Sequence, residues 1–486
     1  MPPTQRGRLC LSWRGIRGNA VALSDLTDQL GRSLEGLVST VTEPFADTVV
    51  RLGVTGLSRA GKTVFLTGLV ANLLDRGRMP QLKAESARRI EAAYLQPQPD
   101  DTVARFEFEN HLAALTGDAP HWPESTRSVS ELRLSFRVKP SGLLSGLRGQ
   151  QVVHLDIVDY PGEWLLDLAL LDKTYAEWAD DALTRMAKRP MGAGYLAQAR
   201  AEDGSLPHDE MRAQGLAADF TAYLVAARAA GWSDCTPGRF LLPGDLAGSP
   251  VLTFAPIPLP AITGRGSLWR EMDRRYEAYK AKVVKPFFRQ HFARIDRQVV
   301  LVDVLGAIHA GPQALEDLRQ TMAEILMAFR PGRNGFLSEI LLGRRVEKVL
   351  FAATKADHLH QNQHAALTAI TESLVREARD RAAFSGAEVA AMSLAGLRAT
   401  VEDVVNDLPM VRGRLADGRV AAMYPGELPG DPARLLSPAR QGAERWLDAD
   451  FALMGFQPAR LNLRPGEGPP HIRLDRAAEF LIGDML

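Results

Sequence analysis

Residues 49–63 read VVRLGVTGLSRAGKT, and the second half fits G-x-x-x-x-G-K-[ST] at Gly56, Gly61, Lys62 and Thr63. The apolar start predicts a buried strand, and the residues after the motif repeat their apolar positions at helical spacing. A glycine turn between a strand and a helix points backbone N–H groups inward and forms an anion nest. Lys62 then reaches the β- and γ-phosphates, and the Thr63 hydroxyl binds Mg²⁺. The residues expected to contact a nucleotide here are Gly56, Ser58, Arg59, Ala60, Gly61, Lys62, Thr63 and Val64.

Composition narrows the class of protein. Of the 486 residues, 46% are apolar and 24% charged, which is typical of a globular protein with room for two or three domains. The formal net charge of zero argues against a nucleic-acid partner. Cys10 and Cys235 fit neither a disulfide framework nor a metal spacing, so we expect a reduced, cytoplasmic protein. Because no apolar run reaches 18 residues, we expect no transmembrane helix.

The periodicity predicts an α/β fold, a three-layer P-loop NTPase with a mostly parallel sheet. Strands at 128–138 and 151–158 resemble a hairpin pair, and helical patterns separate later strands at 299–304, 348–353 and 388–392. Residues 76–125 indicate helices and loops, and 250–257 a candidate short strand.

Three regions are expected along the chain. Residues 1–48 form a tail and an amphipathic helix at 20–40, which packs on the domain or, alternatively, docks on a membrane surface or a partner. Residues 49–400 form the P-loop domain with a mainly helical insertion at about 165–297. Residues 401–486 form an extension with a β-hairpin at 411–424 and a terminal helix at 473–486.

A second motif, D-x-x-G, ends the strand at 151–158. Asp159 is expected beside Mg²⁺, and the Gly162 N–H against the γ-phosphate, where glycine permits close approach. Asp156 is a second candidate for the metal shell. The pattern is short, and residues 303–306 also fit it, although there we expect a strand end with a role in the sheet.

Base recognition is predicted after the strand at 348–353, where Thr354, Lys355 and Asp357 fit [NT]-K-x-D. Guanine presents two donors on one edge, which a carboxylate accepts, whereas adenine would leave Asp357 unpaired. An unpaired buried group costs about 1–3 kcal/mol, so Asp357 can discriminate between the bases. The alternative interpretation is an ordinary charged helix start. After the next strand, Ser393 and Leu394 are weaker candidates for letting a backbone N–H reach the guanine carbonyl.

The switch threonine is the hardest element to identify. Thr126 precedes the strand at 128–138, where its hydroxyl can close on Mg²⁺ when the γ-phosphate is present. Ser125 and Ser128 compete for this role, and a strand-edge turn is the alternative. Arg127 is a candidate internal arginine finger, with a solvated arginine as the default interpretation.

The linear order of these motifs is that of GTPases, and the chain resembles the YcjX-like family of P-loop proteins. The stretches that carry the resemblance are GLSRAGKT (56–63), DYPGEWLLDLALL (159–171), RQVVLVDVLGAIHAG (297–311), FAATKADH (351–358), RAT (398–400) and HIRLDRAAEFLIGDML (471–486). The resemblance implies a stress-associated, cytosolic bacterial protein with a GTPase-like core and GTP as its ligand. It implies no substrate beyond the nucleotide.

Two departures from small GTPases affect the expected function. Glu163 stands where many GTPases place a water-orienting glutamine, so hydrolysis is expected to be slow or to need a partner. The insertion of roughly 130 residues is a place for a lid or a partner site, or equally a structural pack of helices.

We expect a Mg²⁺-dependent switch that binds GTP and GDP, with Lys62, Glu163 and Thr126 as catalytic residues and Thr63, Asp159 and Thr126 around the metal. We also expect a protein effector of unknown identity. The alternatives are a nucleotide-binding interaction module with little hydrolysis and a P-loop ATPase or kinase.

Overall fold

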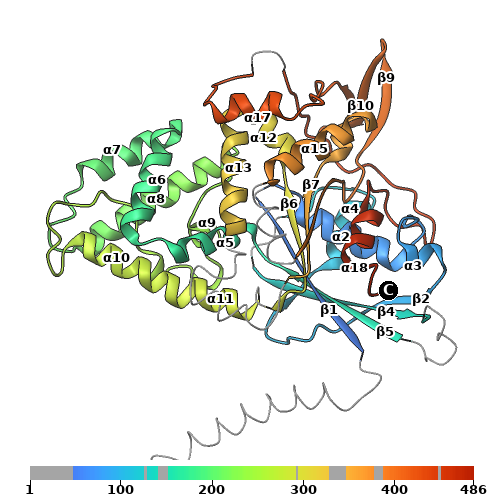
Figure 1. The fold of residues 1–486 in the computed structure, drawn as a ribbon, viewed down its shortest axis with the longest axis horizontal. Coiled ribbons are helices and arrows are strands. Elements are labelled where there is room, and N and C mark those ends of the chain that lie inside the picture. The colour runs from blue at the N-terminus through green and yellow to red at the C-terminus, as the bar shows by residue number, and fades with distance from the viewer. Residues whose placement is uncertain are drawn as a thin grey trace, which may run out of the picture. The chain divides into compact units, whose positions relative to one another are not determined.

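An eight-stranded sheet runs through the region 49–486 (Figure 1). The computed structural model describes residues 47–57, 59–124, 128–140, 151–291, 294–327, 346–376, 387–446 and 450–486. In spatial order the strands are β2 (Ile90–Gln96), β4 (Ser130–Val138), β5 (Gln151–Asp159), β1 (Thr48–Gly56), β6 (Arg297–Val302), β7 (Lys348–Ala353) and β8 (Glu388–Ser393), with β3 (Ala104–Arg105) beside β4. Strands β1, β6, β7 and β8 pair in parallel, whereas β2, β4 and β5 pair antiparallel.

The strands predicted for the sheet are confirmed, including the antiparallel pair β4–β5, whereas the candidate strand at 250–257 is not. The interpretation of residues 76–125 as helices and loops was wrong at β2, whose sequence is IEAAYLQ. This strand lies at the sheet edge and is mostly half-buried. Alanine and glutamate are poor strand formers, so only pairing with β4 specifies the extended conformation.

Helices cover both faces of the sheet, which confirms the three-layer prediction (Figure 1). On one face α2 (Lys62–Asp75), α4 (Phe108–Thr116) and α18 (Leu474–Ile482) contribute buried apolar residues to one core, and the short α3 (Lys83–Ser86) lies nearby in the chain. On the other face α12 (Val304–Ala310), α13 (Pro312–Met327) and α15 (His364–Leu374) contribute to a second core. The predicted terminal helix is confirmed as α18.

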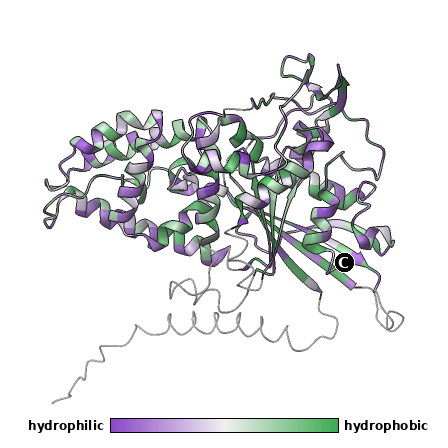
Figure 2. Ribbon diagram, turned by 45° about the horizontal axis from the view of Figure 1, so that its top comes forward, coloured by the Kyte–Doolittle hydropathy of each residue, from purple (hydrophilic) through white to green (hydrophobic). Residues whose placement is uncertain are grey.

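The region between β5 and β6 is mainly helical, as predicted. Its helices are α5 (Gly162–Leu166), α6 (Tyr175–Ala187), α7 (Ala193–Ala201), α8 (Glu210–Ala229), α9 (Gly238–Leu241), α10 (Leu268–Tyr279) and α11 (Lys285–Gln290), and we call the segment from residue 165 to the start of β6 the helical insertion. Figure 2 shows hydrophobic and hydrophilic residues alternating along these helices, as expected when one face of each is buried. None of the helices in the described part of the chain is both long and apolar enough to cross a bilayer.

The candidate strand at 250–257 was wrong. Its first residues form a 3₁₀ turn, Pro250–Leu252, and the rest is irregular. The segment is apolar because it threads the core of the helical insertion, where Ala255 is fully buried. Its backbone carbonyls are satisfied by tyrosine hydroxyls and not by a paired strand. Tyr175 donates to the Ala255 carbonyl at 2.7 Å, and Tyr195 donates to the Pro256 carbonyl at 3.1 Å.

The C-terminal part contains a separate three-stranded antiparallel sheet and a helix. The sheet consists of β9 (Thr400–Val405), β10 (Leu408–Arg414) and β11 (Val420–Met423), and α17 (Ala433–Arg440) follows. The predicted hairpin is the pair β10–β11. Strand β9 was not predicted, although Asn406 and Asp407, both with positive φ, are typical of a tight hairpin turn. The division of the chain at residue 400 stays a prediction.

The strand register brings distant motifs to one edge of the large sheet. Gly56 at the end of β1 lies opposite Leu301 of β6, and Val302 at the end of β6 lies opposite Ala353 of β7. Ala353 in turn lies opposite Ser393 at the end of β8. The loops after these parallel strands therefore emerge at the same edge, where open α/β sheets bind ligands.

Candidate functional site

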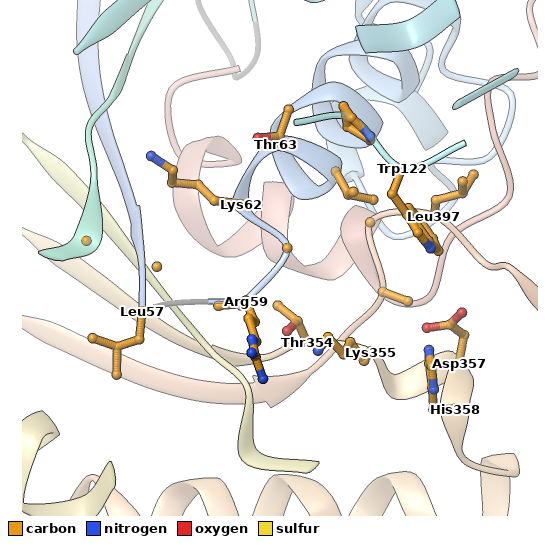
Figure 3. A pocket seen from close by; sticks show the side chains of 18 of the residues that line it. Leu57, Arg59, Lys62, Thr63, Trp122, Thr354, Lys355, Asp357, His358 and Leu397 are labelled. Atoms are coloured by element: carbon orange, nitrogen blue, oxygen red, sulfur yellow. The ribbon is translucent and has the colours of Figure 1, made fainter. Parts of the chain in front are cut away.

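A cavity of about 560 Å³ lies at this edge of the sheet (Figure 3). Its walls come from the loop after β1 with the start of α2, the start of α5, the loops after β7 and β8, and three places outside the sheet: 122–123, Arg228 and 453–456. The lining residues are Gly56, Leu57, Arg59, Ala60, Gly61, Lys62, Thr63, Val64, Trp122, Pro123, Pro161, Gly162, Glu163, Arg228, Thr354, Lys355, Asp357, His358, Ala395, Gly396, Leu397, Leu453, Met454, Gly455 and Phe456.

The loop after β1 takes the conformation that its glycines predict. Gly61 lies in the left-handed region at φ 69°, and its carbonyl accepts the first helical hydrogen bond, from the Phe65 N–H at 2.9 Å. Gly162 packs against this loop so closely that an added Cβ would lie 1.9 Å from the Gly56 carbonyl oxygen. The phosphate loop and the D-x-x-G segment are thus in direct backbone contact. Ser58 lies outside the described residues.

Lys62 and Asp159 form a buried ion pair. The Lys62 Nζ lies 2.7 Å from Asp159 Oδ1 and donates to the Tyr160 carbonyl at 2.7 Å. The two side chains are 11% and 1% exposed. Figure 3 shows the Lys62 ammonium directed away from the side of the cavity that holds Asp357. Asp159 itself is not a lining residue, so it reaches the cavity through Lys62.

The residues at the phosphate-loop end of the cavity have oxygen donors that fit a bound Mg²⁺ ion. Asp159 Oδ2 is buried without a hydrogen-bond partner in the described residues, and Thr63 lines the cavity nearby at the start of α2. Mg²⁺ is commonly held by one or two oxygen ligands together with waters and substrate phosphates. No group of three or more His, Cys, Asp or Glu residues in the described ranges forms a metal cage of its own. Thr126, the third predicted ligand, lies outside the described residues, as do Ser125 and Arg127.

The other end of the cavity carries Asp357, which is 5% exposed. Its Oδ2 accepts from the Ala399 N–H at 3.0 Å, and its carbonyl accepts from the Thr400 hydroxyl. Lys355 has positive φ, 60°, and its Nζ lies 2.5 Å from Asp303 Oδ2. Thr354 is held against β6 by a bond from its N–H to the Val302 carbonyl at 3.0 Å. All three residues of the predicted base-reading motif line the cavity.

Ser393 and Leu394 are fully buried and do not line the cavity. The Ser393 hydroxyl is bonded to the His364 carbonyl and to Thr368, and Arg473 donates to it at 2.6 Å. The residues that face the cavity come just after them, Ala395, Gly396 and Leu397. A nucleotide contact from Ser393 or Leu394 stays a prediction, and the next three residues are nearer candidates.

The other two candidate carboxylates have structural partners. Asp156 forms a two-point pair with Arg133, at 2.6 and 2.8 Å, and does not line the cavity. Asp303 accepts from the Gly306 N–H at 2.9 Å and so caps α12, while also holding Lys355. Asp303 therefore has the expected role at a strand end and also fixes Lys355, which lines the cavity.

Several lining residues carried no sequence signal. Leu453, Met454, Gly455 and Phe456 come from the C-terminal part, and Trp122 donates its Nε1–H to the Phe456 carbonyl at 2.8 Å. Figure 3 shows Trp122 and Leu397 on the side of the cavity that holds Asp357 and His358. These segments form part of the cavity wall at the end that holds Asp357 and His358, and no motif spacing links them.

Arg228 is another lining residue that the sequence motifs did not predict. It comes from α8 in the helical insertion, and its Nη2 lies 2.7 Å from Glu163 Oε1. The Glu163 side chain is 9% exposed. The carboxylate that follows D-x-x-G is therefore already engaged by a cation from the helical insertion.

Comparison with known proteins gives consistent matches along the chain. A model of the YcjX-like family, DUF463, matches residues 50–486. A protein of Escherichia coli (strain K12) named Ras-like GTPase YcjX is 38% identical over 459 residues, which cover 90% of this chain and 96% of that protein. A protein of the same name from Shewanella oneidensis is 35% identical over 473 residues, covering 91% of this chain and 95% of its own length.

Proposed function

Because this chain belongs to the YcjX-like family, we propose that it is a Mg²⁺-dependent switch protein that binds and hydrolyses GTP. The observation that carries the proposal is the shared cavity, in which the phosphate loop lies at one end and Asp357 at the other. These segments lie about 300 residues apart in sequence, and a purine nucleoside triphosphate has matching chemistry, anionic at one end and a hydrogen-bonding base at the other. Relatives named Ras-like GTPase support the choice of GTP.

At the phosphate end, the backbone around Gly61 cradles the phosphates and Lys62 neutralises their charge. Because Lys62 contacts Asp159 and Tyr160 in this structure, its ammonium must leave these partners to reach a γ-phosphate. Thr63 and Asp159 would hold Mg²⁺, the latter directly or through water, with Thr126 as a further proposed ligand. The metal would supply charge neutralisation at the β- and γ-phosphates.

At the base end, Asp357 accepts the two donors of guanine, while its bond from the Ala399 N–H fixes the carboxylate. The aliphatic stem of Lys355 lies across the base, since its ammonium is held by Asp303. Departure of the γ-phosphate releases the contact at Gly162 and changes the order of the switch segments. The stress association implied by the family and a protein effector stay predictions.

The experiment is a titration of the full chain with GTP, GDP and ATP in the presence of Mg²⁺, for wild type and Asp357→Ala. We expect the wild type to prefer GTP and the variant to lose roughly 1–3 kcal/mol of that preference, about 5- to 150-fold in affinity. Asp245→Ala, an exposed carboxylate outside the cavity lining, is the matched control. Equal wild-type affinities for GTP and ATP would remove the base-reading assignment.

A nucleotide-binding module with little hydrolysis is the second candidate, because Glu163, which stands in the place of a water-orienting glutamine, is engaged by Arg228. Multiple-turnover phosphate release at saturating GTP separates the two functions. Release above the background of the Lys62→Ala variant supports the enzyme, and its absence with GTP binding intact supports the module.

A further inference from the structure

The end of helix α8 is fixed over the phosphate loop. Arg228 lies in its last turn, one residue before Ala229 at the helix terminus. The Ala229 carbonyl accepts from Arg59 Nη2, in the phosphate loop, at 2.7 Å. A helix terminus leaves carbonyls without internal partners, and here a phosphate-loop side chain satisfies one of them. The helical insertion is thereby anchored beside the position of a triphosphate.

The helical insertion also surrounds Glu163. Arg228 pairs with its carboxylate, and Gly238, at the start of α9, packs so closely that an added Cβ would lie 2.1 Å from the Glu163 carbonyl oxygen. On the other side Gly162 contacts the phosphate loop. The guanidinium of Arg228 is therefore held by the residue that directly follows Gly162, which we propose to sense the γ-phosphate.

Four cationic side chains line the cavity among the described residues: Arg59, Lys62, Arg228 and Lys355. Lys355 is held at the base end by Asp303, and Arg59 spans to Ala229. Lys62 belongs to the phosphate loop itself. Arg228 is the cation that pairs with Glu163, and its side chain is 27% exposed, which leaves it accessible to a ligand in the cavity.

We propose that Arg228 is a catalytic residue: an internal arginine finger, delivered by the helical insertion, that contacts the γ-phosphate of GTP during hydrolysis. This inference rests on the proposed function. A planar guanidinium suits the purpose because it binds phosphate oxygens at two points and keeps its charge. Glu163 holds Arg228 in the absence of a triphosphate, and the anionic γ-phosphate competes with Glu163 for it.

In the reaction, the oxygen of a water molecule forms a bond to the γ-phosphorus while the bond from that phosphorus to the bridging oxygen breaks. GDP leaves with the bridging oxygen, and the proton lost by the water is carried by the inorganic phosphate or the solvent. Charge develops on the γ-phosphate oxygens and on the bridging oxygen. Arg228 stabilises this charge, and the Glu163 carboxylate, once released, can accept a hydrogen bond from the water.

The test compares wild type, Arg228→Ala and Arg228→Lys as full chains with Mg²⁺. Three quantities are measured: GDP affinity, the single-turnover rate of GTP hydrolysis, and formation of the complex of GDP with aluminium fluoride, which mimics the transferred phosphoryl group. We expect Arg228→Ala to keep GDP affinity, to lose roughly 10³-fold in rate, and to form no aluminium fluoride complex. Arg228→Lys restores little, because an ammonium lacks the two-point geometry.

Arg200→Ala is the matched control, since Arg200 is an exposed arginine of α7 outside the cavity lining. A wild-type rate in Arg228→Ala overturns the inference and leaves the proposed function standing. A fall in GDP affinity and melting temperature that accounts for the whole loss of rate overturns it too, because Arg228 would then only fasten the helical insertion. A wild-type chain that neither binds nor hydrolyses GTP removes the proposed function and this inference together.

Discussion

The loops at the carboxyl edge of the sheet and the helical insertion contribute to one cavity by different routes. The loops carry their chemistry in short motifs, each placed directly after a strand, as with Lys62 after β1 and Asp357 after β7. The helical insertion has an aromatic core, in which the rings of Trp178 and Tyr276 stack with centroids 5.1 Å apart. Its contribution to the cavity, Arg228, belongs to no motif. A motif identifies residues that lie together in one loop. The packing of the helical insertion, in contrast, brings a single side chain to the cavity from a distant position in the chain.

The strongest test of the loop region is Lys62→Ala. We expect turnover to fall by about 10²–10³-fold or more, because a preorganised cation aimed at the phosphates is lost. Without nucleotide, the variant should also unfold more easily, by roughly 3–5 kcal/mol, because the buried Asp159 carboxylate loses its partner. Phosphate release and urea unfolding measure the two effects.

The double variant Lys62→Ala with Asp159→Asn is the control for this prediction. It should regain most of the stability without regaining turnover. If it regained neither, the destabilisation would have a source other than the unpaired carboxylate.

The contact between the phosphate loop and the D-x-x-G segment is tested by Gly162→Ala. The added Cβ would lie 1.9 Å from the Gly56 carbonyl oxygen, so the backbone must shift at the phosphate loop. We expect a cost of about 1–3 kcal/mol, seen as about 5- to 150-fold weaker GTP affinity in a nucleotide titration.

Gly215→Ala in α8 is the matched change in the helical insertion, where the added Cβ meets no atom within 4 Å. It should leave affinity unchanged and raise stability by roughly 0.5–1 kcal/mol. Equal effects of the two changes on affinity would contradict the direct coupling of the loops.

The ion pair between Arg228 of the helical insertion and Glu163, beside the loops of the sheet edge, is tested by Glu163→Gln. Removing the carboxylate charge weakens the pair with Arg228 while keeping the size of the side chain. If Glu163 holds Arg228 back, single-turnover hydrolysis should rise about two- to fivefold, the equivalent of a partly exposed ion pair worth up to 1 kcal/mol. A decrease would show that the carboxylate acts on the water more than it restrains Arg228.

The smallest expected effect is a change of folding stability with pH that arises from one buried carboxyl of the helical insertion, Asp167. Burial raises the pKa of Asp167 from 3.8 to about 7, although Tyr279 donates to its Oδ2 at 2.5 Å and the Gly238 N–H to its Oδ1 at 2.7 Å. Between pH 3.8 and about 7 the folded state thus keeps a proton that the unfolded state has lost, so this carboxyl lowers stability as pH rises through that window.

Asp167→Asn should flatten this part of the stability profile. Urea unfolding at several pH values checks it, with GTP affinity at neutral pH expected to stay the same. An unaltered profile in the variant would mean that Asp167 titrates normally or that another group carries the dependence.

The sequence was sufficient to predict those parts of the fold and of the candidate site in which a motif directly follows a strand in the chain. The parallel strands read as apolar runs because both of their faces are buried, and the residues after each run predicted the phosphate loop and the Asp357 segment. It failed where pairing decides conformation: β2 is extended because β4 lies beside it, and 250–257 is apolar because a helical core surrounds it.

The amino-acid sequence by itself determined the fold class, the family and the motifs that line the two ends of the cavity, because strand, turn and motif are neighbours in the chain. Tertiary structure alone decided that Lys62 contacts Asp159, that Phe456 and Trp122 line the cavity, and that Arg228 reaches Glu163. Such contacts join residues tens to hundreds of positions apart, and their distances are set by how whole elements pack against each other.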